Sequence, residues 1–300
     1  MEKPYKSGLY IVSLIFLFSF GLSLLGVYFA GVLSTKVALF LFIATLFSSA
    51  ISVTILGGFF TSLVSYLIHL KRLYRYDNLS NSLLLKLSQD APGTYHHSIL
   101  VANMAAGAAK EIGADSLLCR VASYFHDVGK LKNPGFFIEN QNPYLQNTLE
   151  AKLNSPQKNA QILIDHVKEG VKIAKGAHLP KEVINIIAQH HGDSTCVYFY
   201  DVAKKRDYKN TKKSEFKYEG PKPQSKEAAI LMLADCLEAS ARVKEGYKDI
   251  KSLVENTFLD KMKEKQLDFS SLSNKDIFRL KKAFVDTLES MLHPRIEYPK

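Results

Sequence analysis

The sequence predicts an all-α protein in which a two-helix transmembrane hairpin precedes a cytoplasmic helical domain. Two uncharged runs, residues 7–35 and 37–70, lie near the start of the 300-residue chain with only Lys36 between them. Beyond residue 76 the apolar residues recur at helical spacing, and no alternating strand pattern extends over more than a few residues. Five of the nine histidines fall on or at the ends of these predicted helices. This pattern excludes a wholly soluble chain, a disordered chain and a disulfide scaffold.

The two uncharged runs predict the hairpin. A membrane-spanning helix needs about 20 predominantly apolar residues, and Tyr10–Leu33 and Val37–Phe60 both reach that length. A cleaved signal peptide has a shorter apolar core, so the first run does not fit one. We expect a tight turn at Leu33–Lys36 and a helix that continues out of the membrane over Phe59–Leu70. Residues 1–70 would thus form the hairpin and its membrane-exit helix.

Charge sets the predicted orientation and compartment. The net charge is +10, and the first 70 residues contribute only four charged side chains. Basic residues precede the first span and follow the second: Lys3, Lys6, Lys71, Arg72 and Arg75. The positive-inside rule therefore places both termini in the cytoplasm of a multi-pass cell-membrane protein, with the basic flank against anionic lipid. Three cysteines without C-x-x-C spacing fit a reducing compartment and small buried side chains: Cys119, Cys196 and Cys236.

The cytoplasmic part begins with a predicted juxtamembrane linker helix, residues 71–95. Periodic apolar spacing then predicts helices over Ser98–Ile112, Asp115–Phe125, Ser155–Gly176, Lys181–His191, Lys226–Val243, Ile250–Lys265 and Asn274–Leu292. Asp115 and Ser155 are suitable N-caps, and Pro156 suits a first helical position. Ser273 and Asp276 resemble a capping box at the start of the last helix.

Two segments interrupt the helical pattern. Asn133–Asn154 is rich in Asn, Pro and Gly and predicts a loop. Thr195–Ser225 interleaves lysines with aromatic residues. Such a segment can hold a nucleotide by phosphate pairing and base stacking. A solvated insertion near the membrane surface explains the same composition equally well, and both interpretations stay open.

An ordered set of histidines and aspartates predicts the chemistry. The set is His97, His126, Asp127, His166, His190, His191 and Asp235. Imidazole and carboxylate groups bind first-row metals, and helical bundles build metal sites from inward-facing side chains. Seven ligands exceed the need of one ion and suit two, with a carboxylate bridging them about 3.5–4 Å apart. Lys130 would supply a cation for phosphate oxygens.

Longer motifs surround these residues. They are Pro92–Ser98, His126–Lys130, Phe136–Gln141, His166–Gly170, Gln189–Gly192, Gly220–Ala229 and His293–Pro299. Together they resemble the seven-transmembrane HD-domain phosphohydrolases, a family that includes the PgpH-type cyclic di-AMP phosphodiesterases. The resemblance runs from about Asn78 to the end of the chain and implies an HD-domain helical bundle over residues 96–300.

The resemblance implies a role for each residue of the set. One metal would be bound by His97, His126, Asp127 and Asp235, and the other by His166, His190 and His191, with Asp127 bridging. His97 is chosen over His96 because it directly precedes Ser98, as the family ligand does. The metals would be iron or manganese, and the catalytic residues Asp127 and Lys130, with Lys130 also contacting the substrate. The substrate would be cyclic di-AMP, opened to linear pApA.

Two departures from the family pattern affect these expectations. Two predicted spans leave no room for an extracytoplasmic sensor, so we expect a membrane anchor, unless Met1 is not the natural start. Asp193-Ser194-Thr195 stands where the cyclic di-GMP enzymes have a Gly-Tyr-Pro signature, which disfavours a guanine substrate.

Other functions of the same domain stay open. Cyclic di-GMP, a dNTP or a guanosine polyphosphate is the alternative substrate, and a non-catalytic cyclic-dinucleotide receptor is the alternative class. The net positive charge suits an anionic dinucleotide. No nucleic-acid-binding motif is present, so we expect no nucleic-acid partner, and a homo-oligomer is left open.

Overall fold

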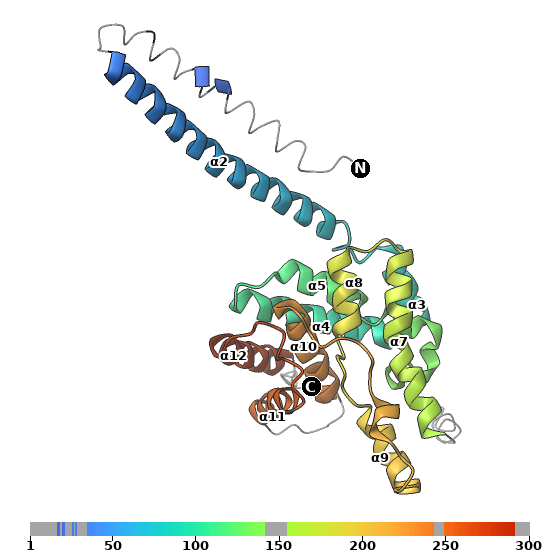
Figure 1. Cartoon of the computed structure of the whole chain (residues 1–300). Coiled ribbons are helices and arrows are strands. Elements are labelled where there is room, and N and C mark those ends of the chain that lie inside the picture. Colours follow the sequence, from blue (N-terminus) through green and yellow to red (C-terminus); the bar gives the residue numbers. More distant parts are fainter. Residues whose placement is uncertain are drawn as a thin grey trace, which may run out of the picture. The chain divides into compact units, whose positions relative to one another are not determined.

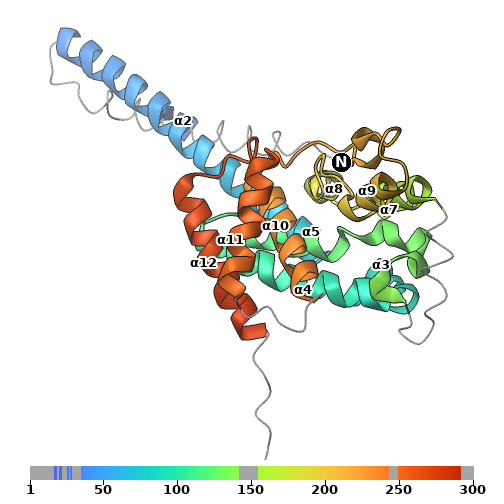
Figure 2. The same ribbon diagram turned by 90° about the horizontal axis from the view of Figure 1, so that it is seen from below.

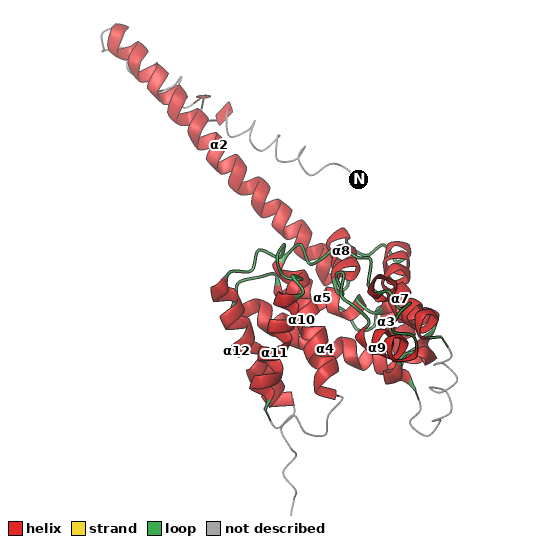
Figure 3. Ribbon diagram, turned by 60° about the horizontal axis from the view of Figure 1, so that its bottom comes forward, coloured by secondary structure: helices red, strands yellow, loops and turns green. Residues whose placement is uncertain are grey.

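The computed structural model describes residues 35–141, 155–242 and 249–291, with a few single residues before residue 35. The chain divides into two compact units, residues 1–72 and residues 73–300. Within the described residues every regular element is a helix or a helical turn, apart from one isolated bridge between Thr195 and Lys217 (Figure 3). The predicted all-α class is therefore confirmed.

The first unit is described mainly through helix α2, Thr35–Tyr74. Its stretch Phe42–Tyr74 is long and apolar enough to cross a membrane, and it is the one such helix among the described residues. The second predicted span, Val37–Phe60, lies within α2, which continues as a helix over residues 59–70 as expected. The first predicted span, Tyr10–Leu33, lies almost wholly outside the described residues. The hairpin therefore stays a prediction.

The second unit is a bundle of helices joined by short segments (Figure 1). Its α-helices are α3 (Ser82–Asp90), α4 (Pro92–Glu111), α5 (Ser116–Phe125), α7 (Pro156–Gly176), α8 (Lys181–Gln189), α9 (Val197–Arg206), α10 (Lys226–Arg242), α11 (Ile250–Lys263) and α12 (Asn274–Met291). Among the residues that the structure describes, four 3-10 turns lie between these helices: η1 (Val128–Lys132), η2 (Pro134–Phe136), η3 (Ile138–Asn140) and η4 (Lys213–Phe216).

The predicted helix starts are confirmed where they were specified. The Asp115 and Ser155 side chains each accept a main-chain hydrogen bond in the first turn of their helices, and Pro156 opens α7. Ser273 and Asp276 form a reciprocal pair: the Ser273 amide donates to the Asp276 carboxylate, and the Asp276 amide donates to the Ser273 hydroxyl. These bonds satisfy amides that a helix leaves unpaired at its N-terminus.

Three predicted boundaries differ from the structure. The predicted linker helix, residues 71–95, is not continuous: α2 ends at Tyr74, the Asn81 side chain caps a new helix, α3, and α4 begins at Pro92. Helix α4 begins at Pro92, six residues before the predicted Ser98, because proline is well accommodated at a first helical position. Helix α9 forms within Thr195–Ser225, which the sequence did not predict to be helical. The predicted loop Asn133–Asn154 begins with the turns η2 and η3, and its part from residue 142 onward lies outside the described residues.

The hydrophobic core positions α4 and α10 at the middle of the bundle. One cluster packs α4, α5 and α8 around Phe125 and includes Leu73, Leu84 and Leu87 from the 71–95 segment. A second cluster packs α4 and α10 against α11 and α12. Figure 2 shows α11 and α12 on one side of α10, and α7, α8 and α9 on the other. The three cysteines are free, as predicted: Cys119, Cys196 and Cys236.

Candidate metal centre

The bundle brings the seven predicted ligands together from five parts of the chain. His97 lies on α4, and His126 and Asp127 directly follow α5. His166 lies on α7, the pair His190 and His191 follows α8, and Asp235 lies on α10. All are buried except His191, which is partly exposed. Helix ends supply four of them, where the chain can turn and present adjacent side chains to one point.

The first ligand group consists of His97, His126 and Asp127, whose ligand atoms all lie within 4.8 Å of one another. Asp127 Oδ2 lies 3.2 Å from His126 Nε2 and 3.7 Å from His97 Nε2. Asp235 Oδ1 lies 3.0 Å from His97 Nε2 and 3.8 Å from His126 Nε2. Two imidazoles and two carboxylates thus face one position.

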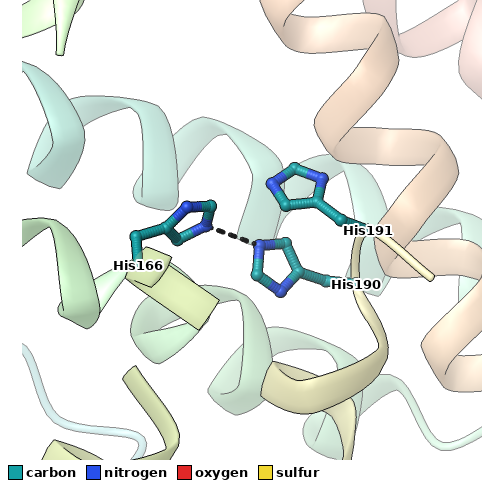
Figure 4. A group of neighbouring side chains, drawn as sticks. All are labelled: His166, His190 and His191. Carbon is teal, nitrogen blue, oxygen red and sulfur yellow. Dashed lines mark hydrogen bonds between the residues drawn. The ribbon is translucent and has the colours of Figure 1, made fainter. Parts of the chain in front are cut away.

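The second ligand group consists of His166, His190 and His191, also within 4.8 Å of one another. Figure 4 shows the three rings converging, with Nε2 of His166 3.2 Å from Nε2 of His190. Asp127 Oδ1 lies 3.2 Å from His166 Nε2 and 3.8 Å from His190 Nε2. The two oxygens of Asp127 therefore face different ligand groups, as a bridging carboxylate requires.

Hydrogen bonds to the outer ring nitrogens orient these imidazoles. Nδ1 of His126 donates to the Ser123 carbonyl at 2.8 Å, and Nδ1 of His190 donates to the Ile187 carbonyl at 2.6 Å. His166 makes the same bond to the carbonyl three residues before it. This arrangement directs each Nε2 lone pair inward, and His126 Nε2 is buried without a hydrogen-bond partner. A buried imidazole nitrogen without a hydrogen-bond partner is available as a metal ligand, so the residues fit the predicted ions.

Burial and neighbouring charges shift the pKa values of residues in the two groups in different directions. Burial would lower the pKa of His126, but the Asp127 and Asp235 carboxylates outweigh it and raise that pKa to about 10. For His190, burial and the neighbouring imidazoles His126 and His166 together lower the pKa to about 3. Burial opposes ionisation of Asp127, yet His126 and Lys130 hold the pKa of that carboxyl well below its usual range.

Lys130 is tied into the centre by two carboxylates. Its Nζ lies 2.8 Å from Asp127 Oδ2 and 2.7 Å from Glu139 Oε1, and 4.9 Å from the centre of the Phe137 ring. The Thr94 hydroxyl also donates to Glu139 Oε1, at 3.0 Å. The predicted phosphate-binding lysine thus lies at the centre, with its charge neutralised by Asp127 and Glu139.

A glycine allows the two ligand groups to approach each other. A Cβ on Gly129 in η1 would lie 1.8 Å from the His166 carbonyl oxygen and 2.5 Å from the Gly170 amide. Because these are main-chain atoms, no side-chain movement relieves the clash. A residue without a Cβ therefore lets the chain after Asp127 lie directly against α7.

Three further residues at the centre were missed by sequence reasoning. Glu238 contacts His97 Nδ1, and the Tyr218 ring lies against His191 with centroids 4.3 Å apart. Glu139 pairs with Lys130. Glu238 follows Asp235 by three residues, so helical spacing placed it on the same face. No comparable signal marked the contact made by Tyr218.

With this geometry in hand, comparisons with known proteins identify the fold. Residues 94–240, which include all seven ligands, match the HD domain. The crystallised HD domain of the Listeria monocytogenes phosphodiesterase PgpH, in complex with cyclic di-AMP, is 36% identical and aligns with a TM-score of 0.66. That alignment covers 72% of this chain and 99% of the crystallised one. The chain belongs to the HD-domain family.

Two full-length relatives extend the relationship. The HD-domain chain is 41% identical over 235 residues to cyclic-di-AMP phosphodiesterase PgpH of Bacillus subtilis and 36% identical over 230 residues to that of L. monocytogenes. Each alignment covers 76% of this chain and 32% of the relative. The resemblance predicted from the motifs is therefore confirmed. The chain, an HD-domain phosphohydrolase, spans about a third of the length of the curated relatives it matches.

Proposed function

We propose that this protein is a membrane-anchored phosphodiesterase that hydrolyses cyclic di-AMP to linear pApA at a dinuclear metal centre. The observation that carries the proposal is the position of Asp127, whose two oxygens face the two ligand groups. Homology to PgpH phosphodiesterases, and to an HD domain crystallised with cyclic di-AMP, supports the choice of substrate. The proposal covers the substrate, the metals and the membrane attachment together.

In this proposal the seven residues hold two divalent ions, iron or manganese. His97, His126 and Asp235 would hold one ion, His166, His190 and His191 the other, and Asp127 would bridge them. Two-metal centres supply a hydroxide nucleophile at neutral pH and stabilise charge in an in-line displacement at phosphorus. The main-chain bonds to Nδ1 keep the imidazoles in the tautomer that offers Nε2 to an ion.

Lys130 is proposed to act in the same reaction. Its ammonium group is held between Asp127 and Glu139, so it is both fixed in place and adjacent to the bridging carboxylate. A phosphate oxygen at the centre would meet this cation, which would offset the charge that develops during attack. Because Glu139 and Asp127 hold Lys130 from two directions, its position is set before substrate arrives.

A cavity beside the second ligand group supports a nucleotide substrate. It has a volume of about 260 Å³, and its walls include His190, His191, Tyr218, Phe199 and Lys261. Aromatic rings in the lining suit stacking on a nucleobase, and the lysine in the lining suits a phosphate. Several of these residues come from the basic and aromatic Thr195–Ser225 segment, which favours the nucleotide-binding interpretation of that segment over a solvated insertion.

The membrane attachment is proposed from the apolar N-terminal region. Phe42–Tyr74 supplies one helix of suitable length and composition. We propose that Tyr10–Leu33 forms the other arm of a hairpin, with both termini and the HD domain in the cytoplasm. The basic residues that follow the second arm would lie against anionic lipid.

The test is a product assay with the full chain in detergent or lipid nanodiscs. The metal-free protein is loaded with Mn²⁺ or Fe²⁺ and offered cyclic di-AMP, cyclic di-GMP, a dNTP, a guanosine polyphosphate and pApA. We expect cyclic di-AMP to give pApA faster than any other substrate is consumed. A protein that holds two ions per chain yet never yields pApA would disprove the substrate assignment. Tight binding of intact cyclic di-AMP in that protein would indicate a receptor instead.

A further inference from the structure

One ligand histidine is held differently from the others. His126, His166 and His190 each donate from Nδ1 to a carbonyl three residues earlier in their own helical segment. His97 instead directs Nδ1 to the carboxylate of Glu238, on a helix 141 residues further along the chain. The orientation of the His97 ring therefore depends on how α4 and α10 pack together.

The Glu238 side chain is buried and is fixed by a second contact. Its side chain is 3% exposed, and its second oxygen accepts a hydrogen bond from Nε of Arg242, one turn further along α10. Asp235 lies three residues before Glu238 on the same helix and contacts the opposite nitrogen of the ring, with His97 Nε2 3.0 Å from Asp235 Oδ1. Two carboxylates of α10 thus hold both nitrogens of one imidazole.

The two kinds of support have different physical consequences. A main-chain carbonyl is a neutral acceptor whose position is fixed by its own helix. A carboxylate is charged, and it makes the imidazole that donates to it a more basic ligand. The second ligand group has main-chain support for His166 and His190, whereas the first relies on a single side chain for His97. A change at Glu238 should therefore affect one ligand group and leave the other intact.

We propose that Glu238 is a positioning residue that acts through His97 and makes one of the two metal positions depend on a charged side chain. This rests on the dinuclear centre of the proposed function but not on its substrate. Loss of such outer-shell partners costs about 10–100-fold in metal affinity in characterised metal sites. The expected consequence is unequal binding, in which one ion is weakened and the other is unchanged.

The experiment is a titration of the metal-free full chain with Mn²⁺, followed by isothermal calorimetry. The unmodified protein should bind two ions. In Glu238→Ala one binding step should weaken about 10–100-fold while the other keeps its affinity. Glu238→Gln, which keeps an acceptor for His97 Nδ1, should recover part of the loss. Glu227→Ala is the matched control, because Glu227 lies on the same helix but bonds to the Asp115 amide away from the centre.

A double-mutant cycle separates positioning from a general structural role. If Glu238 acts through His97, then Glu238→Ala should change nothing further in a His97→Ala background. Additive losses, an equal loss at both metal steps, or unchanged affinities would each overturn the proposal. If Glu238→Ala does not fold, the Gln variant decides the matter by the same criteria. Failure to cleave cyclic di-AMP would leave this result standing, whereas an unmodified protein that binds fewer than two ions would refute the dinuclear centre itself.

Discussion

The two ligand groups differ both in residue types and in surroundings. The first group lies among charged side chains, with Asp127, Asp235 and Glu238 around its two imidazoles and Lys130 beside them. The second group is three imidazoles packed against aromatic rings, with Tyr218 against His191 and Phe137 edge-on to His166. One group is an ionic network and the other an aromatic cluster.

The two ligand groups are therefore not equivalent as candidate metal positions. Carboxylates raise the pKa of His126 to about 10, so without metal the first group retains a proton. Burial and neighbouring imidazoles lower the pKa of His190 to about 3, so this imidazole of the second group is neutral. An ion that binds His126 would therefore displace a proton, whereas an ion that binds His190 would not. Each prediction below tests the link between the groups or the support of one of them.

Removing the link should have the largest effect. In Asp127→Asn the carboxylate proposed to bridge the ions loses its charge and one of its two acceptor oxygens, so the two ions can no longer share it. We expect kcat to fall by about 10³-fold or more, beyond the loss of a single transition-state donor. The measurement is pApA production at saturating Mn²⁺. Asp286→Asn is the control, since Asp286 is an exposed aspartate on α12, away from both ligand groups, and is paired with Lys282 at 2.9 Å. Activity within tenfold of the parent would disprove the bridging role.

Separating the two groups should have the next largest effect. Gly129→Ala places a methyl group 1.8 Å from the His166 carbonyl oxygen, so η1 and α7 must move apart. We expect a loss of about 1–3 kcal/mol in the free energy of unfolding, as for other overpacked sites. Binding of the ion at the second ligand group should weaken as well. Gly107→Ala is the matched control, because nothing lies within 4 Å of a Cβ there and alanine favours a helix by about 1 kcal/mol. Equal stability of the two variants by denaturant titration would contradict the close approach.

Sequence reasoning recovered most of the elements that support the centre. Apolar spacing and caps gave α5, α7, α8, α10, α11 and α12 to within two residues at each end. It missed α9, because lysines and aromatic residues there obscure the helical pattern, and it began α4 too late because Pro92 was not taken as a helix start. Local signals thus predict elements well where one face is regularly apolar.

The residues of the candidate site were likewise predicted only in part. All seven predicted ligands lie together in the structure. They could be predicted because their residue types and their order along the helices mark them. Glu238, Tyr218 and Glu139 were not predicted, since their partners lie at least nine residues away in the sequence and become neighbours only when the bundle packs. That packing adds to the difference that the ligand residue types already make between the two groups.

A smaller effect should follow from removing the aromatic support of the second group. The rings of Tyr218 and His191 are 4.3 Å apart and inclined by 31°, a near-parallel contact. In Tyr218→Leu we expect kcat/KM to fall up to about tenfold, consistent with aromatic pairs worth about 0.5–1.5 kcal/mol. Tyr218→Phe should retain activity. Tyr208→Leu, at a 71% exposed tyrosine of the same segment, should change nothing. If Tyr218→Leu weakens metal binding at the first ligand group instead of the second, the distinction drawn between the two groups is wrong.

The smallest effect concerns a residue outside both groups. It gives the size of a purely structural loss of stability, with which the effects of the other variants can be compared. Hydrogen bonds from Lys226, at 2.8 Å, and from Ser273 lower the pKa of Asp276 to about 2, from an ordinary value of 3.8. Asp276→Asn should therefore cost about 1 kcal/mol of stability at pH 7, a typical value for a capping residue. Because the folded-state pKa lies below the unfolded one, this difference should be complete above the ordinary value and disappear as the pH falls through about 2. Urea titrations of the metal-free protein from pH 7 downward measure it. Metal affinity at both positions should match the parent, and a change there would show that stability and metal binding are not separable in this bundle.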